Sequence, residues 1–265
     1  MFDIIIPAFN CSSTLGRALA SLETQIFKDF RIIIVDDCST EDITPIIQEK
    51  QKNLEIVYIR KETNEGPGLA RQTGIDNASS NYVAFLDADD VLMPYTVETW
   101  YYMVLANSNI DVFHSYFYEQ SYSDGTPVLL LHQRGFTWMH GKLYKLSFLK
   151  NNNIRFHKDL RYMEDSYFNS ICTELGLSAI ISIPMYIWIN NPTSITRIDN
   201  GDFHKDKLSN FIHGIYLSTM FLEEHGVTNI NHIKNTMEYI ESEIANGQTL
   251  SDSAKEELNY ITTYI

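Results

Sequence analysis

Short runs of apolar residues alternate with amphipathic stretches through the first third of the chain. The apolar runs lie at residues 3–7, 30–35, 54–59 and 83–86. The stretches between them repeat apolar residues at helical spacing, most clearly at Leu15, Ala18, Leu19 and Leu22. Unbroken apolar strands separated by helices are typical of a parallel sheet covered on both faces. The pattern therefore predicts a doubly wound α/β half.

The pattern changes in the second part of the chain. An apolar run at residues 111–118, a turn at residues 123–125 and a second run at 128–131 predict a β-hairpin. A hairpin adds antiparallel pairs, so the complete sheet is expected to be mixed. A helix stopped at Gly176 is expected to begin near Glu164 and Asp165.

The tail beyond Phe203 predicts three amphipathic helices. Their apolar positions are Leu208, Phe211, Ile212, Ile215 and Tyr216, then Ile230, Ile233, Met237, Ile240 and Ile244, then Leu258, Ile261 and Ile265. Packing on the rest of the protein, a homo-oligomer contact and a membrane surface are all open to such helices. Packing is favoured because the polar faces are rich in Glu rather than basic.

Composition and charge narrow the possible functions. The 265 residues include 34 acidic residues against 20 Lys and Arg, a net charge of -14. This balance argues against a broad nucleic-acid-binding face. Cys11, Cys38 and Cys172 are scattered without the spacing of a metal site or a disulfide framework, which favours a reducing, cytoplasmic setting.

The apolar runs are too short to cross a membrane. The longest one, near residues 180–189, is interrupted by Ser182 and Pro184, and spanning a bilayer takes about 20 apolar residues. The first residues carry no basic leader, and their apolar run breaks at Pro7. We expect no integral membrane segment. Peripheral attachment at the inner face of a membrane stays open.

Acidic residues follow the fourth apolar run, in the string FLDADD at residues 85–90. Ligands of doubly wound sheets bind beyond the carboxyl ends of the strands. Extended backbone places Asp87 and Asp89 about 6.5 Å apart on one side, where they repel by about 2 to 3 kcal/mol. A Mg²⁺ or Mn²⁺ ion would offset this repulsion. The alternative is a solvated turn in which Asp89 or Asp90 caps a helix beginning near Pro94.

Five strings together resemble the family 2 glycosyltransferases. They are IIPAFN at 5–10, VDDCST at 35–40, NEGPGLAR at 64–71, FLDADD at 85–90 and MEDSYF at 163–168. The resemblance covers about the first 200 residues. It implies a Rossmann-like GT-A fold that binds a nucleoside-diphosphate sugar, usually a UDP-sugar, with Mn²⁺ or Mg²⁺. It also implies transfer of the sugar to an acceptor hydroxyl with inversion, as in polysaccharide biosynthesis.

The resemblance also implies roles for residues of the first half. Those implied for donor binding are Pro7, Ala8, Phe9, Asp37, Asn64, Gly66, Arg71, Asp87, Ala88 and Asp89. Among them Asp89 is the implied metal ligand, Asp87 the ribose ligand and Asp37 a nucleobase contact, while Asp36 supports the turn. Gly66 and Gly68 have an alternative reading as structural glycines of a tight helix entry.

The second half supplies the acceptor side and the base in this family. Asp165 is the implied general base, and Trp138, His140, Lys142 and Glu164 border the donor sugar and acceptor. The alternatives are a simple helix cap at Glu164 and Asp165, and a packing role for the aromatic residues with a solvated Lys142. Ser194 and Arg197, in a segment similar to the family's closing segment, are implied to reach the diphosphate, or lie in a surface loop.

These readings give a domain plan and a set of partners. Residues 1–200 form the expected GT-A domain, with a nucleotide-binding half at 1–90 and an acceptor half at 91–200, and residues 201–265 form a helical extension. The expected partners are a nucleotide sugar and a glycan or lipid-linked acceptor. A nucleotidyltransferase and a non-catalytic sugar-nucleotide-binding protein are the alternatives. The particular sugar and acceptor are not readable from these residues.

Overall fold

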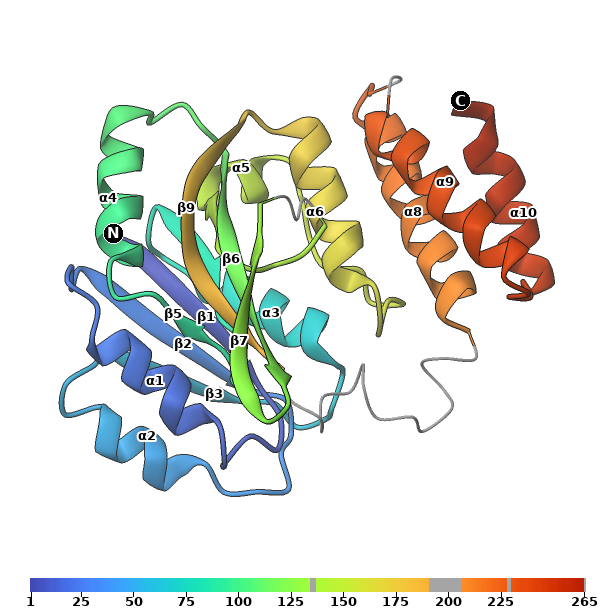
Figure 1. Cartoon of the computed structure of the whole chain (residues 1–265). Coiled ribbons are helices and arrows are strands. Elements are labelled where there is room, and N and C mark those ends of the chain that lie inside the picture. Colours follow the sequence, from blue (N-terminus) through green and yellow to red (C-terminus); the bar gives the residue numbers. More distant parts are fainter. Residues whose placement is uncertain (134–136, 191–205, 228–229, 265) are drawn as a thin grey trace. The chain divides into compact units, whose positions relative to one another are not determined.

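The computed structural model describes residues 1–133, 137–190, 206–227 and 230–264 (Figure 1). These residues divide into two compact units, which are described separately. Unit 1 comprises Met1–Gly135, Met139–Arg155 and Leu177–Asn190. Unit 2 comprises Phe136–Trp138, Phe156–Gly176 and Asn191–Ile265. The predicted domain boundary at residue 200 lies outside the described residues.

Four parallel strands form the first part of the sheet in unit 1. They are β1 (Phe2–Ala8), β2 (Phe30–Asp36), β3 (Ile56–Arg60) and β4 (Tyr82–Phe85), and they lie in the order β3-β2-β1-β4. The run of apolar residues predicted all four strands, with ends displaced by one or two residues. Their carboxyl ends meet at one edge of the sheet, which is where the motifs of the sequence lie.

Helices connect these parallel strands. They are α1 (Leu15–Glu23), α2 (Thr44–Lys50) and α3 (Pro67–Asp76), while α4 (Thr96–Ala106) lies further along the chain, after this parallel set. The predicted apolar face of α1 is buried. Helix α3 packs closely on β1. The contact leaves no room for a side chain at Gly74, since an added Cβ would lie 2.3 Å from the Cγ2 of Ile5. The doubly wound α/β prediction is confirmed for this half.

The second part of the sheet is mixed, as predicted. Antiparallel β8 (Lys142–Lys145) joins β4 to the long strand β6 (Val112–Ser123), and β6 pairs in parallel with β9 (Ser178–Ile189). A short strand, β5 (Val91–Leu92), pairs with β9. The described residues thus form one nine-stranded sheet, and the short helix α5 (Leu146–Asn151) follows β8.

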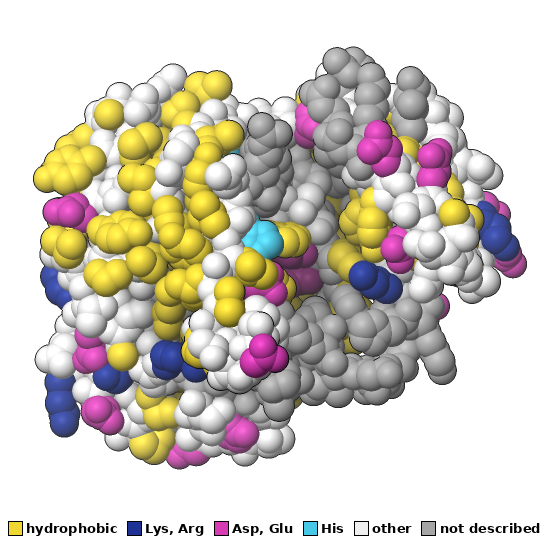
Figure 2. Space-filling view, viewed as in Figure 1, with side chains coloured by type: hydrophobic (Ala, Val, Ile, Leu, Met, Phe, Trp, Pro, Cys, Tyr) yellow, Lys and Arg dark blue, Asp and Glu magenta, His cyan; other side chains and the backbone are white. Residues whose placement is uncertain are grey.

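The predicted hairpin joins β6 to β7 (Thr126–His132) through a two-residue turn. Asp124 and Gly125 both have positive φ angles, 50° and 76°, which is the backbone of a type I′ turn. Residues 128–131 of β7 are exposed large hydrophobics. Figure 2 shows apolar side chains gathered over the region of α4 and the long strands.

Unit 2 is helical. Its elements are α6 (Glu164–Leu175), α8 (Lys207–Glu224), α9 (Asn231–Ala245), α10 (Asp252–Ile261) and the 3-10 helix η1 (Thr262–Tyr264). The predicted apolar positions Leu208, Ile212 and Ile215 are buried in α8, whereas Ile244 of α9 is exposed. Within the described chain, none of the helices combines the length and the apolar character needed to span a bilayer.

Candidate functional site

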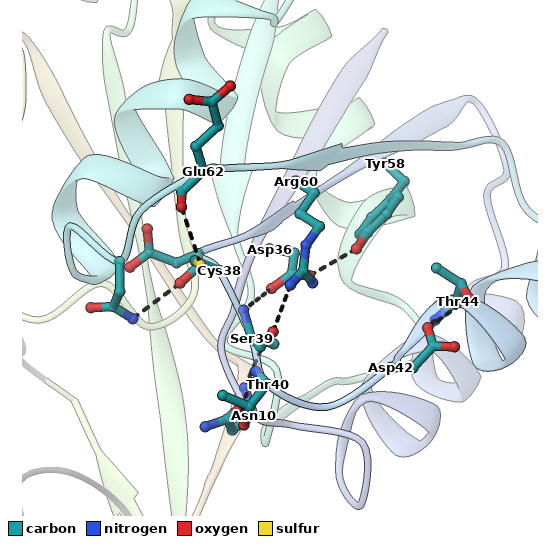
Figure 3. Close-up of polar contacts among 12 residues, drawn as sticks. Asn10, Asp36, Cys38, Ser39, Thr40, Asp42, Thr44, Tyr58, Arg60 and Glu62 are labelled. Carbon is teal, nitrogen blue, oxygen red and sulfur yellow. Dashed lines mark hydrogen bonds and ion pairs between the residues drawn. The ribbon is translucent and has the colours of Figure 1, made fainter.

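The turn after β2 is built on the buried carboxylate of Asp36. One oxygen accepts the backbone N–H of Ser39 at 2.8 Å. The other accepts the hydroxyl of Tyr58 at 2.8 Å and the guanidinium of Arg60 at 2.5 Å (Figure 3). Burial raises the pKa of Asp36, but these hydrogen bonds and Arg60 hold it below its ordinary value. Asp36 therefore supports the turn, in agreement with the sequence-based expectation.

Asp37 connects the ends of three strands. Its N–H donates to the carbonyl of Ala8 at 2.8 Å. Its carboxylate accepts the backbone N–H groups of Glu65 and Gly66, the latter at 2.7 Å, and pairs with Lys61 at 2.7 Å. The side-chain amide of Asn64 donates to the Asp37 carbonyl at 3.0 Å. Asp37, Asn64 and Gly66, which the sequence placed in one site, are thus in direct contact.

The loop after β1 lies against the same turn. Phe9 is 49% exposed beside Pro7 and the buried Ala8. Asn10 binds the turn three times: its N–H donates to Ser39 Oγ at 2.9 Å, and its Oδ1 accepts the Thr40 N–H at 2.8 Å and the Thr40 hydroxyl at 3.1 Å (Figure 3). An exposed aromatic ring at this edge is available to a planar ligand such as a nucleobase.

The second acidic turn follows β4. The carboxylate of Asp87 forms an ion pair with Arg71 of α3 at 2.8 Å. Ala88 is buried, Asp89 is half-buried, and the Asp89 carbonyl accepts the guanidinium of Arg17 at 2.6 Å. Burial raises the pKa of Asp87, but Arg71 and His140 lower it below its usual value overall. Asp87 is therefore ionised at neutral pH.

Neither Asp89 nor Asp90 caps the next helix. The N-cap position of α4 is Tyr95, and the helix entry is closed by the Thr96 N–H donating to the Met93 carbonyl at 3.0 Å. The alternative reading of the acids as a helix cap is wrong, because β5 separates them from α4. Asp90 is instead 1% exposed and lies in the turn directly before β5.

Asp90 binds strand β9 through both carboxylate oxygens. Oδ2 accepts the Tyr186 hydroxyl at 2.6 Å, and Oδ1 accepts the Ile189 N–H at 2.7 Å. The same Tyr186 oxygen accepts the backbone N–H of Asp87 at 3.2 Å. Burial raises the pKa of Asp90 well above its ordinary value, and the charges of Asp87 and Asp89 raise it further.

His140 lies among aromatic rings next to this turn. Its ring is 4.9 Å from those of Phe117 and Tyr186 and stacks on Trp188 at 5.4 Å. Burial lowers the pKa of His140 to about 4, so the imidazole is neutral at pH 7. His140 therefore packs among aromatic rings and also lies beside Asp87.

These side chains provide a set of atoms suited to a divalent cation. Among the described residues, ligand atoms of Asp87, Asp90 and His140 lie within 4.8 Å of one another. Carboxylate oxygens and a neutral imidazole are ligands that Mn²⁺ accepts. Both oxygens of Asp90 already accept hydrogen bonds, and Asp89, the metal ligand expected from the sequence, is not one of the three residues of this cluster.

The segment between the hairpin and α5 is largely buried. Lys142 is 1% exposed on β8, between β4 and β6, so the alternative of a solvated Lys142 is wrong. Tyr144 is fully buried and belongs to the core. Trp138 is half-buried and belongs to unit 2.

The predicted base lies in the first turn of α6. The N-cap residue is Met163, with a φ of 63°, so Glu164 and Asp165 are not caps but helix residues near the positive end of the helix dipole. Glu164 is buried and Asp165 is half-buried. The Asn169 amide donates to the Asp165 carbonyl at 2.9 Å and fastens this turn. These residues belong to unit 2, and Ser194 and Arg197 lie outside the described residues.

Several site residues were missed by reasoning from the sequence. Lys61 and Arg60 follow or end β3, at the same edge as the acids, and their position offered a signal. Tyr186 gave no such signal, because it lies 96 residues beyond Asp90 in the chain.

Comparison with known proteins identifies the family. The model of Glycosyl transferase family 2 matches residues 3–167, which is more than half of the chain. The chain therefore belongs to the family 2 glycosyltransferases.

Two curated relatives illustrate the likeness. Poly(ribitol-phosphate) beta-N-acetylglucosaminyltransferase TarS of Staphylococcus aureus is 29% identical over 185 residues, covering 63% of this chain and 31% of TarS. Glycosyltransferase GlyA of Streptococcus pneumoniae is 27% identical over 283 residues, covering 95% of this chain and 39% of GlyA. The chain thus spans less than two fifths of either relative.

Solved structures confirm the GT-A type fold. The crystal structure of TarS 1-349 from S. aureus in complex with UDP-GlcNAc has a TM-score of 0.72 at 21% identity, covering 86% of this chain and 70% of that one. Mannosyltransferase PcManGT from Pyrobaculum calidifontis, in complex with GDP-Man and Mn²⁺, has a TM-score of 0.59 at 13% identity, covering 83% of this chain and 64% of that one.

Proposed function

We propose that this chain transfers a sugar from a UDP-sugar to an acceptor hydroxyl with inversion at the anomeric carbon, aided by a divalent cation. The observation that carries the proposal is the convergence of two acidic turns at the carboxyl edge of a family 2 sheet. Asp37 there contacts Asn64 and Gly66, and Asp87 contacts Arg71. The TarS complex with UDP-GlcNAc makes this donor the first to test.

The two turns would bind different parts of the donor. In this proposal Asp37, the exposed ring of Phe9 and the loop of Asn64 and Gly66 take the nucleobase, while Asp87 takes the ribose. Asp89, with Asp87, would hold Mn²⁺ or Mg²⁺. Such an ion neutralises the leaving diphosphate and orients it. The proposal adds that His140, Lys142 and Trp138 border the sugar and acceptor, with Glu164 beside the base.

Asp165 is the proposed general base. Inversion in a single displacement needs a group that takes the proton of the attacking hydroxyl on the face opposite the leaving group, and no covalent sugar-enzyme intermediate. General-base assistance contributes about 10² to 10⁴-fold in rate. In this proposal Asp165 takes that role toward the anomeric carbon of the bound donor. The acceptor would be a glycan or a lipid-linked glycan precursor.

The first experiment is a screen of UDP- and GDP-sugars with Mn²⁺ and with Mg²⁺, read by release of the nucleoside diphosphate. We expect hydrolysis or transfer with a UDP-sugar that stops in EDTA. Release of pyrophosphate instead would indicate a nucleotidyltransferase. Tight nucleotide-sugar binding with no turnover toward any acceptor would indicate a binding protein.

A second experiment isolates the base. Asp165→Asn keeps the shape of the side chain but removes its proton-accepting capacity, so transfer should fall by about 10³-fold. Calorimetric titration should show that UDP and Mn²⁺ bind as in the wild type. Asp159→Asn, an exposed acid in the same unit, serves as the matched control. Full turnover by Asp165→Asn would contradict this role.

A further inference from the structure

We propose that Tyr186 is a positioning residue that holds the backbone of the second acidic turn in the geometry needed to bind the nucleotide sugar. The expected effect on donor affinity rests on the proposed function. The contact network that links strand β9 to Asp87 and Asp90 rests on the structure alone.

The network begins where the parallel ladder ends. The N–H of Leu86 still bonds to the Ile5 carbonyl of β1 at 3.0 Å. The next N–H, that of Asp87, leaves the ladder and donates to the Tyr186 hydroxyl oxygen at 3.2 Å. That hydroxyl donates its own proton to Asp90 Oδ2 at 2.6 Å. Tyr186 thus bridges the first and last residues of the turn.

Other contacts make this bridge the point that orients Asp87. The turn is closed internally by the Asp90 N–H donating to the Asp87 carbonyl at 3.1 Å. Arg17 binds the carbonyl of Asp89 from α1. These two contacts hold the carbonyl side of the turn, and Tyr186 holds its amide side. Rotation of the Asp87 peptide would redirect both the Asp87 and Asp89 side chains.

Tyr186 is itself held firmly. It is 1% exposed, packs against His140 at 4.9 Å, and lies on β9 opposite Leu92 of β5. Strand β5 begins directly after Asp90, so the hydroxyl bridge and the β5–β9 pairing connect the same two segments. A buried hydroxyl that serves as both donor and acceptor specifies geometry, because losing it leaves Asp90 and the Asp87 N–H each without that partner.

The chain contains a matched control. Tyr95 also fastens β9 through its hydroxyl, which donates to the Pro184 carbonyl at 2.9 Å. Tyr95→Phe therefore removes a hydroxyl bond to the same strand without touching the acidic turn. A purely structural role of Tyr186 predicts that Tyr186→Phe and Tyr95→Phe behave alike.

The experiment compares these two variants by amide hydrogen exchange and by UDP binding with Mn²⁺. We expect amide exchange at residues 87–90 to quicken about tenfold in Tyr186→Phe and to stay at the wild-type rate in Tyr95→Phe. The dissociation constant of UDP with Mn²⁺ should rise about tenfold in Tyr186→Phe alone, while both variants lose similar thermal stability. Steady-state kinetics on the same donor should show a raised KM with a smaller change in kcat.

The outcomes separate the two proposals. Equal exchange at residues 87–90 in both variants would overturn the positioning role, whatever the protein binds. Faster exchange in Tyr186→Phe with no loss of UDP affinity would also overturn it, because the turn would then not set donor geometry. If the wild type binds no nucleotide at all, the proposed function fails, and the consequence claimed for Tyr186 fails with it, while the exchange data still report the contact network.

Discussion

The two acidic turns of this protein share one arrangement of side chains but differ in the charges around the buried aspartate. Each follows a buried parallel strand, and each uses one buried aspartate to hold the turn, Asp36 in the first and Asp90 in the second. In each, a tyrosine hydroxyl donates to that aspartate, from Tyr58 or from Tyr186. The neighbouring acids are thereby presented at the edge of the sheet.

The difference lies in the charges around the buried aspartate. Asp36 receives the guanidinium of Arg60, and its pKa is lowered. Among the described residues, Asp90 accepts hydrogen bonds from two uncharged donors, the Tyr186 hydroxyl and the Ile189 N–H. Its pKa is raised by burial and by two neighbouring carboxylates. The aspartate that holds the first turn is thus paired with a cation, whereas, within the described part of the chain, the aspartate that holds the second turn is not. This contrast is why we place the divalent cation at the second turn.

The largest expected effect comes from removing the half-buried acid of the second turn, Asp89. Asp89→Ala should reduce transfer by about 10³-fold and abolish the stimulation of UDP binding by Mn²⁺, because charge neutralisation of the diphosphate depends on it. Asp124→Ala removes the same charge at the exposed tip of the hairpin and should leave both quantities unchanged. Metal-stimulated binding that survives in Asp89→Ala would mean that the cation lies elsewhere.

The buried acid of the first turn should matter for stability instead. Asp36→Asn replaces an acceptor of three hydrogen bonds and should cost about 2 kcal/mol of unfolding free energy. Asp42→Asn changes an exposed acid that binds only Thr44 and should cost less than about 0.5 kcal/mol. Urea denaturation measures both. Similar losses in the two variants would show that the Asp36 network contributes little.

The two buried acids should respond to pH with opposite signs. The folded pKa of Asp36 lies below the unfolded value of 3.8, so its stabilisation is present above that pH and is lost as pH falls through the folded pKa. The folded pKa of Asp90 lies above 3.8, so its stabilisation is present below that pH and is lost as pH rises through the folded pKa.

Urea denaturation in EDTA across about pH 3 to 7 checks these signs. The stability advantage of the wild type over Asp36→Asn should grow as pH rises. Its advantage over Asp90→Asn should shrink over the same range. Parallel trends in the two comparisons would remove the electrostatic distinction between the turns.

The smallest expected effect concerns the backbone of the first turn. Cys38 has a φ of 63°, and its thiol donates a weak hydrogen bond to the Glu62 carbonyl (Figure 3). Cys38→Gly should raise the unfolding free energy by about 1 kcal/mol, because glycine adopts this conformation without a Cβ penalty. Cys38→Ala keeps the Cβ and should give no gain. A gain in both variants would point to the thiol rather than to the backbone.

The parallel part of the fold could be predicted because its signals are local. Four apolar runs predicted β1 to β4, and the hairpin was predicted by Asp124 and Gly125. Strand β8 was missed because Lys142 and Lys145 make it look polar, although the sheet buries Lys142. The full length of β9 was hidden by Ser182 and Pro184, near which its pairing with β6 shifts register.

The site residues also differ in whether their signals are local in the sequence or depend on residues far along the chain. The acids of both turns stand beside strand ends in the sequence, so their shared edge was predictable. The partners were harder to find: Arg60 lies 24 residues from Asp36, with only its place at the end of β3 as a signal, and Tyr186 lies 96 residues from Asp90 with none. Whether a buried carboxylate has a cationic or an uncharged partner can be judged only when such partners are known.

The most direct test of the central claim is anomalous X-ray scattering from crystals grown with UDP and Mn²⁺. The account predicts one manganese peak beside Asp89 and Asp87, in contact with the diphosphate, and no peak at Asp36 or Asp37. A diphosphate bound without manganese at the second turn, or manganese at the first, would contradict it.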